Sequence, residues 1–150
     1  MNPNRTLLAL LAAAACIGYA AHGLGVEPAK HGQAAAQREK VVFQMSDGDP
    51  KKWNLALNNA KNVQDDLGAK NVEIEIVAYG PGIGMIKLDS EAANRVGEAI
   101  ASGVRVVACE NTMTNMKLKK ADMLPSLGYV PAGVVELMRR QKEGYAYIRP

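Results

Sequence analysis

The chain has 150 residues, of which 48% are hydrophobic and 22% are charged, and its formal net charge is +3. This composition is that of one ordinary globular domain with a leader, and it excludes a disordered or fibrous chain. The charge is also too balanced for the strongly basic face of a nucleic-acid-binding protein, so we expect no nucleic-acid partner.

The amino terminus has the pattern of a secretory signal peptide. Arg5 precedes an apolar stretch over residues 7–18, and small residues follow it. The stretch is shorter than the about 20 residues that a bilayer crossing needs. We therefore expect a signal peptide over residues 1–21 and a periplasmic or secreted protein. Lipid attachment at Cys16 is the alternative to cleavage, and only that modification would make the membrane a partner.

Residues 22–39 are rich in glycine and alanine and are predicted to form a linker, which leaves residues 40–150 as the folded domain. Both histidines of the chain, His22 and His31, fall in this linker. The domain therefore cannot activate a nucleophile with histidine or build a histidine zinc site. Its chemistry must use thiol, carboxylate, amine or backbone groups, and we expect no bound metal or cofactor.

The domain is predicted to begin with a strand and a long helix. Residues 40–45 form an apolar strand, and Asp49 and Pro50 then provide an N-cap and a first helical residue for a helix that ends before Gly68. Apolar residues recur along this helix at helical spacing, so one face should pack on a sheet. That face comprises Trp53, Ala56, Leu57, Ala60, Val63 and Leu67.

A second strand and a second helix follow. The strand is expected over residues 72–79, with Glu73 and Glu75 alternating against apolar residues and so exposed on one face. The next helix should begin at Asp89 or Ser90. Its predicted inward residues are Ala92, Val96, Ala99 and Ile100.

The remaining elements continue the alternation. We expect a buried strand over residues 104–108, a helix over 112–120, a short strand near Tyr129, a helix over 131–142 and a strand over 145–149. Strands that alternate with helices predict a parallel or mostly parallel sheet covered on both faces. The predicted helices over residues 112–120 and 131–142 carry six basic residues that we expect to form solvated surface. They are Lys117, Lys119, Lys120, Arg139, Arg140 and Lys142.

Ligands of such sheets gather beyond the carboxyl ends of the strands. The loops at those ends are residues 46–49, 80–84 and 109–112, and we expect them to converge. Asp47 and Asp49 have the spacing of an aspartyl phosphatase, but the later loops lack the further carboxylates that this chemistry needs. Helix capping by Asp49 is the favoured interpretation.

Gly80, Gly82 and Gly84 could let a phosphate approach the backbone, but their spacing matches neither the P-loop nor the dinucleotide motif. A tight loop or a subunit contact is favoured. Four apolar residues further along, Met113, Met116, Met123 and Leu124, exceed what one small sheet is expected to cover, which predicts association between subunits.

Cys109 is the strongest candidate for chemistry. It follows a buried strand and precedes a helix whose predicted cap is Asn111 or Thr112, so unpaired backbone N–H groups should favour its thiolate. Glu110 opposes this effect. A buried, unreactive cysteine is the alternative. A lesser one is a Cu(I) site, because Met113 and Met116 follow at helical spacing and thioethers suit that ion.

Residues 40–150 resemble the DsrE/DsrF-like family along the whole domain. The matching segments are KVVFQMS at 40–46, AYGPG at 78–82, GVRVVAC at 103–109 and GYVPAGVV at 128–135. In sulfur-relay members of that family, a cysteine at the end of the third strand accepts sulfur as a persulfide and passes it on. The resemblance implies this catalytic role for Cys109.

The resemblance also implies a three-layer α/β/α fold with a five-stranded, mostly parallel sheet, and assembly as a trimer or hexamer. It implies donor and acceptor proteins for the sulfur. This chain differs from the cytoplasmic relay members of the family in having a leader. The alternative function is a non-catalytic oligomeric binding or assembly module in which Cys109 only packs, so enzymatic activity stays open. We place substrate contacts at Gly80, Gly82, Asn111 and Thr112.

Overall fold

The computed structural model describes residues 38–150. The predicted signal peptide, Cys16 and nearly all of the predicted linker therefore lie outside the described residues. Glu39, the last residue of that linker, already belongs to the first strand. No helix within residues 38–150 is long and apolar enough to cross a membrane.

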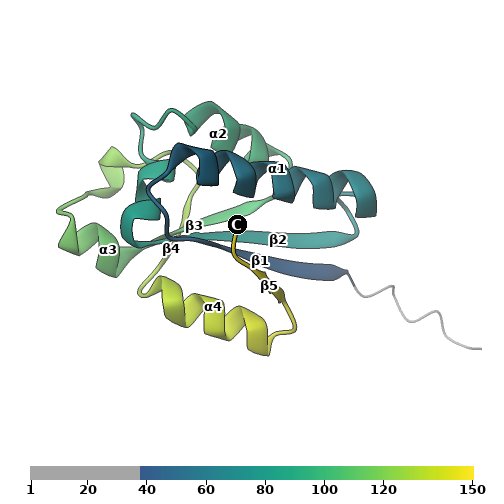
Figure 1. The fold of residues 1–150 in the computed structure, drawn as a ribbon. Coiled ribbons are helices and arrows are strands. Elements are labelled where there is room, and N and C mark those ends of the chain that lie inside the picture. The colour runs from purple at the N-terminus through teal and green to yellow at the C-terminus, as the bar shows by residue number, and fades with distance from the viewer. Residues whose placement is uncertain (1–37) are drawn as a thin grey trace, which may run out of the picture. The chain divides into compact units, whose positions relative to one another are not determined.

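Five parallel strands form one sheet in the order β4-β3-β2-β1-β5. The strands are β1 (Glu39–Met45), β2 (Val72–Ala78), β3 (Arg105–Cys109), β4 (Gly128–Val130) and β5 (Ala146–Ile148). Helices α1 (Pro50–Leu67) and α2 (Ala93–Ala101) cover one face of the sheet, and α4 (Gly133–Lys142) covers the other (Figure 1). The predicted three-layer α/β/α fold is confirmed, and all neighbouring strands run parallel.

Helix α1 begins and ends where the sequence predicts. The Asp49 side chain accepts a hydrogen bond at 2.9 Å from the backbone N–H two residues on, and Pro50 is the first helical residue. Gly68 ends the helix at a φ of 84°, which glycine adopts without steric cost. Leu67 in the last turn is 39% exposed, so it does not belong to the packed face. The buried residues of that face are Trp53, Ala56, Leu57 and Ala60.

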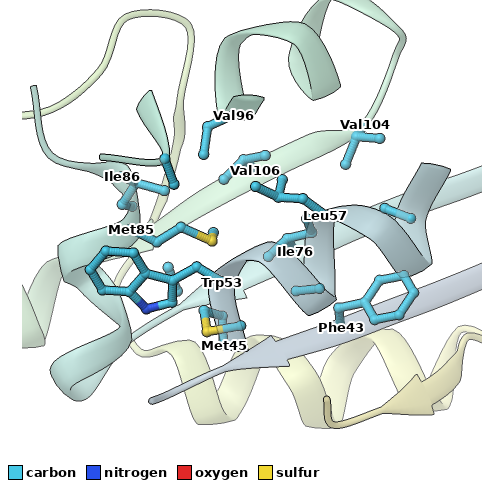
Figure 2. Packing of buried hydrophobic residues seen from close by; sticks show 14 of the residues in the cluster. Phe43, Met45, Trp53, Leu57, Ile76, Met85, Ile86, Val96, Val104 and Val106 are labelled. Carbon is cyan, nitrogen blue, oxygen red and sulfur yellow. The ribbon is translucent and has the colours of Figure 1, made fainter. Parts of the chain in front are cut away.

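Most of the core lies between the sheet and the helices α1 and α2 (Figure 2). The larger apolar cluster includes Phe43, Met45, Trp53, Leu57, Ile76, Met85, Ile86, Val96, Val104 and Val106. The cluster on the α4 face has only five buried members, which are Val42, Val77, Val107, Val130 and Leu137. Since apolar burial scales with area, α4 is held to the sheet by less hydrophobic contact than α1.

Two predictions about the second half of the chain are wrong in their details. Helix α3 spans Glu110–Asn115, whereas residues 112–120 were expected. It ends early because Lys117 has a φ of 55°, which an α-helix does not allow. Met113 and Met123 lie in the larger apolar cluster, so the sheet and its helices do cover them. The short 3-10 segment η2 (Lys120–Asp122) separates them.

The glycine loop and the start of α2 also differ from expectation. The loop forms η1 (Gly80–Ile86), a 3-10 helix that is mostly buried beneath the ends of the strands. Helix α2 begins at Ala93, later than predicted, because Ser90 belongs to the preceding turn. The Ser90 hydroxyl accepts a hydrogen bond from the backbone N–H of Ala92 at 3.2 Å in that turn.

Glu75 corrects the prediction that β2 has a solvent-exposed face. It is 1% exposed, because α4 covers this face and the Arg140 guanidinium lies 2.7 Å from its Oε2. Arg140 was expected on the surface, yet its side chain is only 11% exposed. Glu73 is partly buried and accepts a hydrogen bond from the Tyr145 hydroxyl at 2.8 Å. Alternation in a strand predicts a polar face, but that face can meet a charged helix instead of water.

Candidate functional site

Cys109 lies at the junction between β3 and α3. It is the last residue of the strand and the N-cap of the helix, and it is 5% exposed. Its Sγ accepts a hydrogen bond from the backbone N–H of Thr112 at 3.5 Å and lies 3.9 Å from the Pro131 carbonyl oxygen. The predicted caps, Asn111 and Thr112, are wrong because the strand leads into the helix without a loop. The sulfur takes the position that an oxygen has at an ordinary N-cap.

The first turn of α4 also approaches the thiol. The backbone N–H of Gly133, the first residue of α4, lies close enough to the Cys109 sulfur to lower the pKa of the thiol. Gly133 is buried against Tyr79, and a Cβ atom on residue 133 would lie 3.0 Å from the Tyr79 Cβ. Contacts that short are rare between real Cβ atoms, so glycine allows α4 to start this close to the thiol.

Thr112 connects the thiol to the glycine segment. Its hydroxyl oxygen accepts a hydrogen bond from the backbone N–H of Gly80 at 3.0 Å, and the same side chain lowers the pKa of the Cys109 thiol. Because the oxygen accepts from Gly80, the hydroxyl hydrogen is available for donation to the sulfur. The structure thus brings together three predicted site residues, Cys109, Thr112 and Gly80.

These contacts determine the pKa of the Cys109 thiol. Burial alone would raise this pKa, because it disfavours the charged thiolate. The Thr112 side chain and the backbone N–H groups of Gly133, Thr112 and Asn111 outweigh burial and hold the pKa below its ordinary value. The thiolate is therefore favoured by hydrogen bonds from neutral groups.

The structure shows packing and backbone contacts at Asn111 and Gly82, the other two predicted substrate-binding residues. The Asn111 backbone N–H donates a hydrogen bond to the Pro131 carbonyl at 3.1 Å, close enough to the thiol to lower its pKa, and the residue is otherwise exposed. Gly82 is buried, and a Cβ there would overlap the backbone carbonyl of Met45, so close packing explains this glycine. The substrate-binding roles of the four rim residues stay predictions; these residues are Gly80, Gly82, Asn111 and Thr112.

The two aspartates of the first rim loop have structural partners. Asp49 caps α1, as predicted. The Asp47 carboxylate lies 3.7 Å from the Arg149 guanidinium, and its backbone carbonyl accepts a hydrogen bond from the Trp53 indole at 2.7 Å. These contacts favour the capping interpretation over an aspartyl phosphatase site.

The two methionines of the copper hypothesis lie in different environments. Met113 is 5% exposed and belongs to the apolar core, whereas Met116 is 51% exposed. In the part of the chain that the structure describes, no three or more histidine, cysteine, aspartate or glutamate side chains are grouped to hold a metal ion. Core packing accounts for Met113, and the copper site stays a prediction.

Gly133 and Tyr79 are the site residues that sequence reasoning missed. Both stand in the segments that carry the family resemblance, at the end of β2 and the start of α4. A glycine beside a predicted helix start indicates a close approach, but the approaching residue is 54 positions away in the sequence. No local pattern identifies that residue.

The DsrE/DsrF-like family model matches residues 39–150. The chain is 38% identical to MTH1491, a solved protein of unknown function from Methanobacterium thermoautotrophicum, with a TM-score of 0.71 over 75% of this chain and 99% of that one. BT1422, a conserved protein of unknown function from Bacteroides thetaiotaomicron, is 16% identical, with a TM-score of 0.58 over 75% and 95% of the two chains. The second likeness concerns the fold alone. No curated protein matches the chain.

Proposed function

This chain belongs to the DsrE/DsrF-like family, and from that premise we propose that it accepts sulfur as a persulfide on Cys109 and passes it on. The observation that carries the proposal is the set of hydrogen-bond donors around the Cys109 sulfur. These donors hold the thiol pKa below its ordinary value, and the thiolate is the nucleophilic form.

In the proposed reaction, the Cys109 thiolate attacks the outer sulfur of a donor persulfide. A bond forms between Cys109 Sγ and that sulfur, and the S–S bond of the donor breaks. The inner sulfur of the donor leaves as a thiolate, so the exchange needs no oxidant or reductant. An acceptor thiolate then attacks the outer sulfur of the Cys109 persulfide and releases the Cys109 thiolate. The donors around Cys109 support both steps, because a stabilised thiolate also leaves more readily.

We propose separate donor and acceptor proteins, a periplasmic or secreted location, and self-assembly into a trimer or hexamer. The support for export is the signal-like pattern of residues 1–21. The support for assembly is a group of large apolar side chains exposed on α4 and β5. They are Val134, Val135, Met138, Tyr147 and Ile148.

The second candidate is a non-catalytic assembly module, and the burial of Cys109 favours it. A thiol that is 5% exposed is also what a packing cysteine would show. The two candidates differ in whether the native thiol reacts.

The test is the intact mass of the purified protein after incubation with an inorganic polysulfide. The measurement uses a Cys16→Ser background, so that Cys109 is the only cysteine of the chain. We expect a gain of about 32 Da per added sulfur, removed by reductant, as for a persulfide. Cys109→Ser in the same background should take up no sulfur and should keep its fold.

The opposite result would support the assembly module. In that case the native protein takes up no sulfur, and Cys109 is labelled only after denaturation. Cys109→Ser would then lose about 1–3 kcal/mol of stability, because a hydroxyl replaces a packed thiol.

A further inference from the structure

A cluster of buried charges lies between β2 and α4. Glu75 on β2 is 1% exposed, and Glu136 on α4 is 4% exposed. The Arg140 guanidinium lies between these carboxyls, with its NH2 atom 2.7 Å from Glu75 Oε2 and its Nε 3.1 Å from Glu136 Oε1. The more exposed Arg105 and Arg139 also contact these carboxyls, one each. Burial of the two carboxyls is still costly unless their remaining hydrogen-bonding capacity is used.

Two buried atoms of this cluster make no hydrogen bond within the described residues: Glu75 Oε1, and Arg140 Nε, whose 3.1 Å approach to Glu136 Oε1 is a charge contact only. The Glu75 and Glu136 carboxyls lie on the same Arg140 guanidinium, close enough for each to act on the other's pKa as a hydrogen-bonding partner. A proton held between them turns this contact into an O–H···O hydrogen bond and satisfies Glu75 Oε1.

Other charged and titratable groups face the pair from each neighbouring element. Arg105 on β3 lies 3.0 Å from Glu75 Oε2, and Arg139 forms a paired contact with Glu136 on α4. The groups near the cluster are Glu73 on β2, Arg105 on β3, Arg139, Arg140 and Glu143 at α4, and Tyr145 after it. The guanidinium groups oppose the loss of charge on the carboxyls, whereas burial favours it.

The cluster matters because it fastens the helix that touches Cys109. Leu137 is the only α4 residue in the small apolar cluster on this face of the described domain. The ion cluster therefore supplies much of the contact between α4 and the sheet. The Pro131 carbonyl just before this helix lies 3.9 Å from the Cys109 sulfur, and the N–H of its first residue, Gly133, lowers the pKa of the thiol.

We propose that Glu75, Arg140 and Glu136 are positioning residues for Cys109, and that a proton shared by the two carboxyls makes the docking of α4, and with it the thiolate, depend on pH. The inference rests on the proposed role of Cys109 as a reactive thiolate. Loss of the shared proton leaves two buried carboxylates in contact. Their repulsion loosens α4, withdraws the Gly133 N–H and raises the pKa of Cys109.

The directions of the two carboxyl pKa values define a pH window. Burial raises the pKa of Glu75 despite Arg140, and contact with Glu136 raises it further. The protonated Glu75 carboxyl therefore contributes stability that is fully present below the ordinary glutamate pKa and is lost as pH rises through the raised pKa. Burial also acts to raise the pKa of Glu136, but Arg139 and Glu75 outweigh it and lower that pKa. This second contribution is lost as pH falls through the lowered value, so docking is strongest between the two values.

The experiment is the pH profile of Cys109 alkylation by iodoacetamide in the Cys16→Ser background. The wild-type profile should show two ionisations, that of the thiol and that of the proton shared by the two carboxyls. Above the second one, the alkylation rate should fall below the rate expected for a thiol with one fixed pKa. Where the pH lies below the thiol pKa, the shortfall is about tenfold for each unit by which the Cys109 pKa rises. Glu75→Gln should remove the second ionisation, because its neutral amide can donate to Glu136 at every pH.

Glu73→Gln is the matched control. It makes the same change two residues away on β2, at a carboxyl that contacts Arg38 and Tyr145 instead of α4. This variant should keep the wild-type profile. A second readout is the protection of α4 amides from hydrogen exchange, corrected for intrinsic rates and compared with α1. In the wild type this protection should fall over the same pH range, and in Glu75→Gln it should not.

A wild-type profile with one ionisation, or a second ionisation that survives in Glu75→Gln, would overturn the inference. Alkylation reports the thiol whether or not it carries sulfur. If the protein takes up no sulfur but its alkylation profile shows both ionisations, the proposed function is rejected and the positioning role of the cluster stands.

Discussion

Cys109 accepts a hydrogen bond from the Thr112 N–H of α3, and the Gly133 N–H of α4 also lowers the pKa of its thiol. The folded domain from Lys40 onward contains no histidine, so no imidazole is present to take the thiol proton. Neutral donors stabilise the thiolate without providing a general base. This suits an exchange in which the same sulfur must attack in one step and leave in the next.

Thr112→Val tests the hydroxyl donor. Valine has nearly the same shape, but it neither donates to Cys109 nor accepts from the Gly80 N–H. A hydrogen bond to a charged group is worth about 1.5–3 kcal/mol, so the Cys109 pKa should rise by about one unit or more. Alkylation below the thiol pKa should slow about tenfold for each unit. The unpaired Gly80 N–H should also lower the free energy of unfolding by about 1–3 kcal/mol.

Thr114→Val is the control for that experiment, because Thr114 is an exposed residue of the same helix. It should leave the Cys109 pKa unchanged and alter the free energy of unfolding by no more than about 0.5 kcal/mol. Equal alkylation profiles for Thr112→Val and wild type would show that the backbone donors alone determine the thiolate.

Single residues could be predicted from the sequence where the cause is local. Asp49 and Gly68 bound α1 as expected, because capping and positive φ depend on neighbouring residues. Cys109 could be placed at a strand end for the same reason. Glu75 could not be placed, since its burial depends on Arg140, which lies 65 positions away. The alternation of β2 is the same whether its polar face meets water or a guanidinium.

At the scale of elements, the start of α4 determines how close a second set of donors comes to the thiol. Gly133 packs against Tyr79 at the end of β2, and the smaller apolar cluster holds the helix behind it. The sequence predicted a helix over residues 131–142, and the structure confirms it to within two residues. What it could not predict is the distance between this helix and Cys109, because that distance depends on packing between segments remote in the chain.

Gly133→Ala should therefore weaken the site through the backbone. The added Cβ would lie 3.0–3.2 Å from Tyr79 side-chain atoms, so either Tyr79 or the first turn of α4 must give way by a few tenths of an ångström. We expect a loss of about 1–3 kcal/mol of stability from overpacking and a higher Cys109 pKa from the lost N–H contact. Chemical denaturation and the alkylation profile measure the two effects.

The matched control is Gly97→Ala in α2, where a Cβ would meet nothing within 4 Å. Alanine favours the helix over glycine, so this variant should gain about 0.5–1 kcal/mol and leave Cys109 unchanged. A Gly133→Ala protein with unchanged stability and thiol pKa would mean that α4 does not need its close approach to Tyr79.

At the scale of the whole molecule, the apolar surface is concentrated on the α4 side. Val134, Val135 and Met138 are each more than half exposed on α4, and Tyr147 and Ile148 of the edge strand β5 are also exposed. The opposite helices bury most of their apolar side chains in the larger cluster, with Leu55 and Leu67 of α1 as exposed exceptions. Exposed apolar groups of this kind indicate a contact surface, and the proposed occupant is a second copy of the chain.

Light scattering should therefore find a trimer or hexamer at micromolar concentration. Val134→Lys with Met138→Lys should shift the protein toward monomers, because a cation on each subunit face opposes burial of the contact. Leu88→Lys is the control, since Leu88 is 55% exposed and lies between η1 and α2. That variant should keep the wild-type mass. A monomeric wild type would contradict the assembly, and a double variant that stays oligomeric would place the contact on another surface.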